Sequence, residues 1–241
     1  MNDSILLAAL GWLTDPANWQ GDSGIPTRLW EHVWVSGLSV LIAALLALPV
    51  ALVLGHLGRG GALASTVANL GRAVPTLAVL VILVLSPEPF GLANVVTCTV
   101  VALVLFAVPP ILTNAYAGMR AVDQDLVEAA RGMGLTPSQV LFRVELPLAV
   151  PLVVAGLRIA TAQVIATATI AAIIAGPGLG RFITAGLGNQ DTPQLIGGAV
   201  LVAVFAVLVE VAFQLLQRRV TPARSSREVA EDEVQIPAAL R

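Results

Sequence analysis

Long apolar runs alternate with short polar segments over most of the chain. A helix that crosses a bilayer needs about 20 mainly apolar residues, and five of the runs are long enough. They span residues 33–57, 63–85, 92–116, 146–175 and 195–216. The pattern predicts an all-α polytopic membrane protein with about five transmembrane helices, of which the fourth is long enough to tilt or break.

The third apolar run contains two adjacent prolines, Pro109 and Pro110. Proline donates no backbone hydrogen bond and its ring clashes with the preceding turn, so the pair should kink or break this helix. The carbonyl groups freed in this way would lie near Asn114 and Tyr116. We therefore expect a flexible gate element in the third helix.

Polar segments flank the apolar runs at both ends of the chain. The four tryptophans all lie near the N-terminus, as expected at a membrane–water boundary. Residues 1–30 are therefore expected to form an external or interfacial segment with a short helix, and residues 31–217 a transmembrane domain. Residues 218–241 are polar, mixed in charge and aperiodic, which predicts a mobile cytoplasmic tail.

The distribution of arginine predicts the orientation, because cytoplasmic segments carry an excess of positive residues. With the N-terminus outside, only Arg28 and Arg181 are external, while Arg72 and Arg158 lie within spans. The cytoplasmic segments then hold Arg59, Arg120, Arg131, Arg143, Arg218, Arg219, Arg224, Arg227 and Arg241. The sequence favours this N-out, C-in arrangement, with the polar segment near residues 117–145 in the cytoplasm.

Composition supports the membrane assignment and excludes several functions. The 241 residues are 57% hydrophobic and 12% charged, whereas soluble domains carry about 25% charged residues. A net charge of −2 argues against a nucleic-acid partner. The single cysteine, Cys98, forms no intrachain disulfide and no cysteine-based metal site, and we expect it to be an apolar filler. All basic residues are arginine, so the chain lacks the lysine of a phosphate-binding P-loop, and any ATPase must be another chain.

Helix signals in the segment after the third run predict an elbow of two short helices. Asp123 can cap the first helix, and Gly134 suits the left-handed position that ends one. Thr136, Pro137 and Gln139 then form the capping pattern of a second helix, which leads into the fourth span. We expect this elbow to occupy residues 122–147.

The first elbow helix has a composition that favours docking onto a protein over lying on lipid. Helices that lie on membranes are rich in basic and bulky apolar residues, but this one contains several alanines and glycines with balanced charge. One of its faces groups Val122, Leu126, Ala129 and Met133.

The stretch "EAARGMGLTPSQVLFRVELP" resembles the EAA motif of ABC-importer permeases. Valine at 144, where isoleucine is usual, is the only departure. In that family the segment is a coupling helix that sits in a cleft of the ATPase subunit and transmits ATP-driven closure. The residues to which the resemblance assigns this role are Glu128, Ala129, Ala130, Gly134, Leu135, Val144, Leu146 and Pro147.

Three further stretches, "GRAVPTLAVL", "VPPILTNAYAGM" and "ATATIAAIIAGPGLGRFITAGL", resemble permeases of glycine betaine/carnitine/choline importers. The likeness covers roughly residues 30–217 and implies the type I importer fold in a bacterial inner membrane. It implies a second permease chain, identical or related, and an extracytoplasmic binding protein. It also implies ATPase subunits that hold ATP and Mg²⁺, with no cofactor in this chain and no bond chemistry.

Polar residues within the spans are candidates for the transport path. Arg158 lies deep in the fourth span and should face the helix bundle or water. Gln163 and Thr167 follow it, and hydrogen bonding between helices is their simpler role.

A second polar cluster, Arg72, Pro75 and Thr76, lies in the weakest span, which Asn69 also interrupts. Arg72 is close enough to the cytoplasmic end for its side chain to reach the interface, so structural and pathway roles both stay open.

The substrate is less determined than the family. Quaternary ammonium groups are normally bound by aromatic cages, and with 5% aromatic residues this chain should leave that affinity to the binding protein. A methionine-type permease shares the same plan. An ion-coupled carrier would need an acidic residue in a span, and only Glu210 qualifies. A membrane scaffold would leave Arg158 unexplained. "GPGLG" is expected to be an external turn before a short re-entrant helix.

Overall fold

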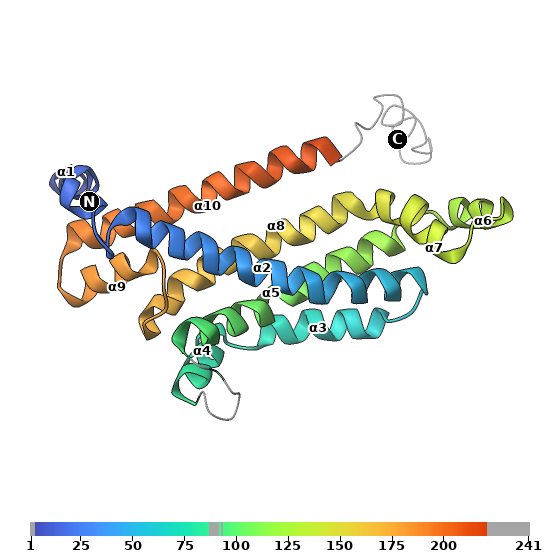
Figure 1. The fold of residues 1–241 in the computed structure, drawn as a ribbon, viewed down its shortest axis with the longest axis horizontal. Coiled ribbons are helices and arrows are strands. Elements are labelled where there is room, and N and C mark those ends of the chain that lie inside the picture. Colours follow the sequence, from blue (N-terminus) through green and yellow to red (C-terminus); the bar gives the residue numbers. More distant parts are fainter. Residues whose placement is uncertain (1–2, 87–91, 93, 221–241) are drawn as a thin grey trace, which may run out of the picture.

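The computed structural model describes residues 3–86, 92 and 94–220, and the regular structure in this part of the chain is helical. Four helices are long and apolar enough to cross a membrane, and they run along the longest axis (Figure 1). They are α2 (Ile25–His56), α5 (Val95–Arg120), α8 (Leu146–Ala171) and α10 (Thr192–Val220). A bent pair, α3 (Gly61–Ala73) and α4 (Thr76–Leu85), can form a fifth span, so the prediction of about five is confirmed.

α5 is the central helix of the bundle. In its most apolar stretch 61% of the residues are buried, compared with 22% for α2 and 11% for α10. Small residues lie where α5 contacts α2 and α8. Ala43 and Ala47 of α2, Ala107 of α5 and Ala160 of α8 are each at most 1% exposed. Small side chains let helices approach closely where lipid offers no hydrophobic driving force. Many bulkier leucines and valines, such as Leu45 of α2 and Leu208 of α10, are exposed, which suits contact with lipid.

The second span is broken, because α3 and α4 meet at an angle of 78°. The break lies at Val74 and Pro75, and Pro75 precedes the first residue of α4. Proline pushes the residue before it into an extended conformation, which ends α3 there. Asn69 and Arg72, which interrupt the apolar run in the sequence, both lie within α3; the side chain of Arg72 is outside the described part.

The third span is not broken at its proline pair. α5 continues through Pro109 and Pro110 as one helix. Two prolines remove only two backbone donors, whereas leaving the helix would expose many polar groups to an apolar surrounding. Of the expected kink or break, the break is therefore absent from α5.

Shorter elements gather at the two ends of the bundle (Figure 1). One end carries α6 (Gln124–Gly132), α7 (Pro137–Val140) and the π-helix η3 (Leu141–Glu145). The other carries α1 (Asp3–Thr14), η1 (Pro16–Trp19), η4 (Ala172–Ile174) and α9 (Gly180–Gly188).

Several predicted boundaries differ from the structure, and two of the differences matter most. α2 begins at Ile25, earlier than the predicted start of the first span, and α10 continues to Val220, into the predicted tail. Residues 221–241 of that tail lie outside the described residues.

Candidate functional site

The elbow, residues 122–147, is built by local capping as the sequence predicts. The carboxylate of Asp123 accepts the N–H of Asp125 at 2.9 Å and begins α6. Gly134 has a φ of +86°, in the left-handed region that glycine tolerates. Thr136 and Gln139 form a complete capping box, in which the Thr136 N–H donates to the Gln139 side chain at 2.8 Å.

The elbow has a small apolar core of its own. Val122, Val127, Ala130 and Val140 are buried there, with Leu135 and Val144 packed against them. Of the face predicted from the sequence, Val122 packs in this core, whereas Leu126, Ala129 and Met133 are exposed. Val127 and Ala130 lie on the side of α6 that packs against α7 and η3.

The opposite side of α6 is exposed. Leu126 is 52% and Met133 75% exposed, and Glu128 and Ala129 are also exposed. The motif residues thus divide into two groups. Glu128, Ala129 and Gly134 lie on the surface, while the remaining residues support the elbow or begin α8. These are Ala130, Leu135, Val144, Leu146 and Pro147.

A buried polar contact joins the elbow to the bundle. The carboxylate of Glu145, a residue 5% exposed, lies 2.5 Å from Nδ1 of His56, the last residue of α2. Glu145 is also the last residue of η3, and π-helical turns are frequent at functional sites. Sequence reasoning missed this pair because its members are 89 residues apart. An acidic residue within "RVELPLAV" was the only available signal.

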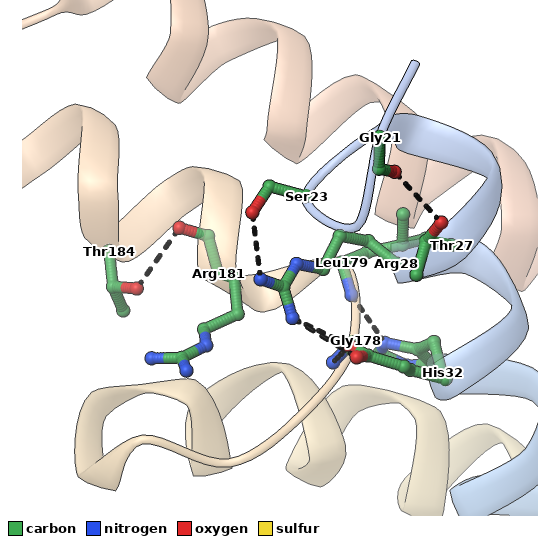
Figure 2. Close-up of polar contacts among 10 residues, drawn as sticks. Gly21, Ser23, Thr27, Arg28, His32, Gly178, Leu179, Arg181 and Thr184 are labelled. Carbon is green, nitrogen blue, oxygen red and sulfur yellow. Dashed lines mark hydrogen bonds and ion pairs between the residues drawn. The ribbon is translucent and has the colours of Figure 1, made fainter. Parts of the chain in front are cut away.

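At the other end of the bundle, α2 holds the glycine loop, residues 176–180 (Figure 2). The Gly178 N–H donates to the Glu31 carboxylate at 2.9 Å, and Arg28 pairs with the same carboxylate at 2.9 Å. The Leu179 N–H donates to Nδ1 of His32 at 3.3 Å, and Nε2 of His32 lies 3.2 Å from the Ile165 carbonyl. This pattern suits the neutral imidazole with its hydrogen on Nε2.

The contact between the glycine loop and α2 leaves no room for a side chain. Gly178 has a φ of +104°, and a Cβ added to it would lie 2.8 Å from Nδ1 of His32, which is fully buried. The expected turn and the short helix after it, α9, are both present. The roles of Glu31 and His32 were not predicted, although a Glu–His pair at the start of an apolar helix is a visible signal.

Four of the predicted pathway residues line one hollow of about 210 Å³. They are Pro109, Pro110, Asn114 and Gln163. Gly71 of α3 lines it as well, and a Cβ there would lie 2.5 Å from Cγ of Pro109. Sequence reasoning did not select Gly71, whose only signal is its place beside the broken span.

The other pathway candidates lie elsewhere. Pro75 and Thr76 begin α4, Tyr116 packs against the main core, and Thr167 is buried in α8. Arg158, which is partly exposed, donates through Nε to Glu210 of α10 at 2.8 Å and through Nη1 to Gln217 at 3.0 Å. Glu210 is thus the partner of Arg158.

A polar cleft of about 850 Å³ lies beside the glycine loop. Trp12, Asp15, Arg181, Asp191 and Gln194 are among its lining residues. Helices α1 and α9, which contribute Trp12 and Arg181 to the lining, lie at the opposite end of the bundle from the elbow (Figure 1).

The chain is similar to known proteins over most of its length. The family described as "Binding-protein-dependent transport system inner membrane component" matches residues 20–225. The choline transport system permease protein OpuBB of Bacillus subtilis is 35% identical over 200 residues, which are 83% of this chain and 90% of that protein. The carnitine transport permease protein OpuCB of Listeria monocytogenes is 35% identical over 205 residues, covering 85% and 91%. Among solved structures, an inward-facing MetNI methionine ABC transporter chain matches with a TM-score of 0.70 at 21% identity, over 92% of this chain and 100% of that one.

Proposed function

The chain belongs to the family of binding-protein-dependent transport system inner membrane components, and on this premise we propose that it carries quaternary-ammonium osmoprotectants as a permease subunit of an ATP-driven importer. A member of this family is a transport subunit and not an enzyme. It crosses the bacterial inner membrane several times, and its fold is that of type I ABC importer permeases.

The exposed side of α6 is the observation that carries the coupling role. Glu128 and Ala129 face outward there with Leu126 and Met133, beyond the end of the bundle. Leu126 and Met133 together form an exposed apolar surface on α6 and its end, and such a surface is suited to a protein groove. We assign this surface to the cleft of an ATPase subunit, which holds ATP and Mg²⁺, and we expect two permease chains, identical or related, to share one path.

Charge supports an orientation with the elbow in the cytoplasm. Arg131 and Arg143 lie in the elbow, whereas Arg28 lies at the other end of the bundle, where it pairs with Glu31. The rule counts positive residues and not net charge, and the elbow end also holds Arg59 and Arg120 against Arg28 and Arg181 at the other end, so arginine is more frequent on the elbow side. The polar cleft at the other end is then external, where a binding protein would deliver its solute.

The substrate class rests on the relatives. OpuBB and OpuCB are named for choline and carnitine, which both carry a trimethylammonium group. The likeness to MetNI, at 21% identity, supports the fold and says nothing about the substrate of this chain. Methionine is therefore kept only as the alternative substrate. The carrier hypothesis loses its candidate coupling residue, because Glu210 is paired with Arg158.

A charge reversal tests the assignment of the elbow. In membranes that hold the whole complex, Glu128→Arg should weaken ATPase association by at least about tenfold, since like charges or an unpaired charge in an interface cost several kcal/mol. Asp22→Arg is the matched control, because Asp22 is exposed at the other end. Normal ATPase association with the Glu128 variant would remove the coupling assignment.

Uptake by the purified complex tests the substrate. Proteoliposomes with the permease, its co-purifying ATPase and the binding protein should import radiolabelled glycine betaine, choline or carnitine only when ATP is supplied. Import of methionine alone would select the alternative substrate. Uptake by the permease chain without ATPase, driven by an ion gradient, would overturn the importer.

A further inference from the structure

α2 makes polar contacts at both of its ends with segments far away in the sequence. It is one helix of 32 residues that continues through Pro49, and at 1.5 Å per residue it is about 48 Å long. Its last residue, His56, contacts Glu145 of the elbow. Near its start, Glu31 and His32 bind the backbone of Gly178 and Leu179, each 147 residues away.

The elbow has few links to the rest of the molecule. Its small core is separate from the main core of the bundle, and in Figure 1 α6 and α7 project beyond the long helices. The chain joins it to the ends of α5 and α8. The pair of His56 and Glu145 adds a third link, to α2, through side chains only 14% and 7% exposed. Removing one partner of a buried pair leaves the other unsatisfied, so this link resists separation.

The elbow end of α2 cannot move independently of its neighbours. A Cβ on Gly55 would lie 2.4 Å from Cβ of Met119 in the last turn of α5, so the two backbones are in close contact. Displacement of Glu145 would therefore be passed to the ends of α2 and α5 together. Packed cores shift between discrete arrangements, and rigid secondary elements carry such shifts over 20–40 Å.

The far end of α2 determines where the glycine loop lies. Two loop N–H groups in succession are held by consecutive α2 side chains, Glu31 and His32 (Figure 2). His32 also contacts the Ile165 carbonyl of α8. The loop leads directly into α9, and Arg181 and Thr184 of α9 line the polar cleft.

We propose that α2 transmits displacement of the elbow to the glycine loop, with His56 and Glu145 as positioning residues at one end and Glu31 and His32 at the other. Movement at the ATPase side thereby changes the position of α9 at the cleft. The proposal rests on the proposed function, because it requires an ATPase that moves the elbow.

The first test measures ATP hydrolysed per glycine betaine imported by the whole complex in proteoliposomes. His56→Ala and Glu145→Ala should each raise this ratio by about fivefold or more, the lower range of allosteric coupling. Arg59→Ala is the control, because Arg59 is exposed just after α2. A variant that only assembles poorly would lower both rates and leave their ratio unchanged.

The second test reads the far end of α2 directly. A Thr184→Cys reporter on α9 should react with a water-soluble maleimide at a rate that depends on ATP and vanadate. The native Cys98 is 1% exposed and adds little background. With Glu145→Ala present, this dependence on nucleotide should disappear although the ATPase remains bound.

Combination variants decide between the proposal and a local structural role. The double variant His56→Ala/Glu145→Ala should be no worse than either single variant, and the exchanged pair His56→Glu/Glu145→His should recover part of the coupling. Fully additive effects, or a reporter that still responds in the single variants, would overturn the proposal. Wild-type complex that imports no glycine betaine would instead count against the proposed substrate alone, because the reporter needs only nucleotide.

Discussion

The elbow and the glycine loop each depend on a glycine with a left-handed backbone, but for different reasons. Gly134 has a φ of +86°, and a Cβ there would meet nothing within 4 Å. Gly178 has a φ of +104°, and its Cβ would lie 2.8 Å from Nδ1 of His32. Gly134 allows a helix to end locally, whereas Gly178 allows the loop to lie against α2, whose Glu31 is 147 residues away. The same residue type thus carries a local constraint at one end and a tertiary constraint at the other.

The largest effect is expected at the tertiary glycine. Gly178→Ala should reduce the free energy of unfolding by at least about 1–3 kcal/mol from backbone strain, and the clash with His32 adds to this. Thermal unfolding in detergent and uptake by the complex measure the loss. Gly188→Ala is the matched control, because a Cβ there meets nothing within 4 Å. Equal behaviour of the two variants would show that the loop moves freely against α2.

A smaller effect is expected at the local glycine. Gly134→Ala should cost about 1–2 kcal/mol, the penalty of a left-handed backbone for a residue with a Cβ. Gly134→Asn should cost less, because asparagine tolerates this conformation. Thermal unfolding of the isolated permease compares the two variants. If both variants lost much more ATPase binding than stability, the ATPase would have to contact this position directly.

The smallest effect is expected at the cap of the second elbow helix. Thr136→Ala removes the hydroxyl that accepts the Gln139 N–H, and should cost about 1 kcal/mol of helix stability. Thr136→Ser keeps that acceptor and should be close to wild type. Hydrogen exchange of the amides of α7 measures the difference. Faster exchange in both variants would mean that packing of the threonine methyl group, and not the cap, stabilises this helix.

Sequence prediction succeeded where the determining interaction spans only a few residues. The helix caps of the elbow were predicted because each depends on its immediate neighbours. The Asp123 cap and the Thr136 capping box join residues at most three apart, and the helix end at Gly134 depends on the backbone conformation of that residue. The apolar runs were also predicted correctly, because membrane thickness sets the length of a spanning helix. Boundaries were less well predicted, since a polar residue such as Glu31 can lie inside a helix when a loop elsewhere satisfies it.

Prediction failed where a second segment decides the outcome. The sequence did not indicate that Val127 and Ala130 would be buried, because this depends on where α7 and η3 lie. The continuity of α5 at Pro109 depended on a surrounding that tolerates missing donors. The partner of Arg158 was equally invisible, because Glu210 is 52 residues away on another helix.

The sequence by itself determined the class of protein, the number of spans and the construction of the elbow, because apolar length, charge bias and helix capping act within short stretches of chain. Only the tertiary structure decided which residues meet: Glu145 with His56, Glu31 and His32 with the glycine loop, and the prolines of α5 with Gly71. Such contacts join residues whose separation in sequence carries no periodic signal, and they become visible only when helices lie side by side. The proposed link between the two ends of the molecule, through α2, depends entirely on that second kind of information.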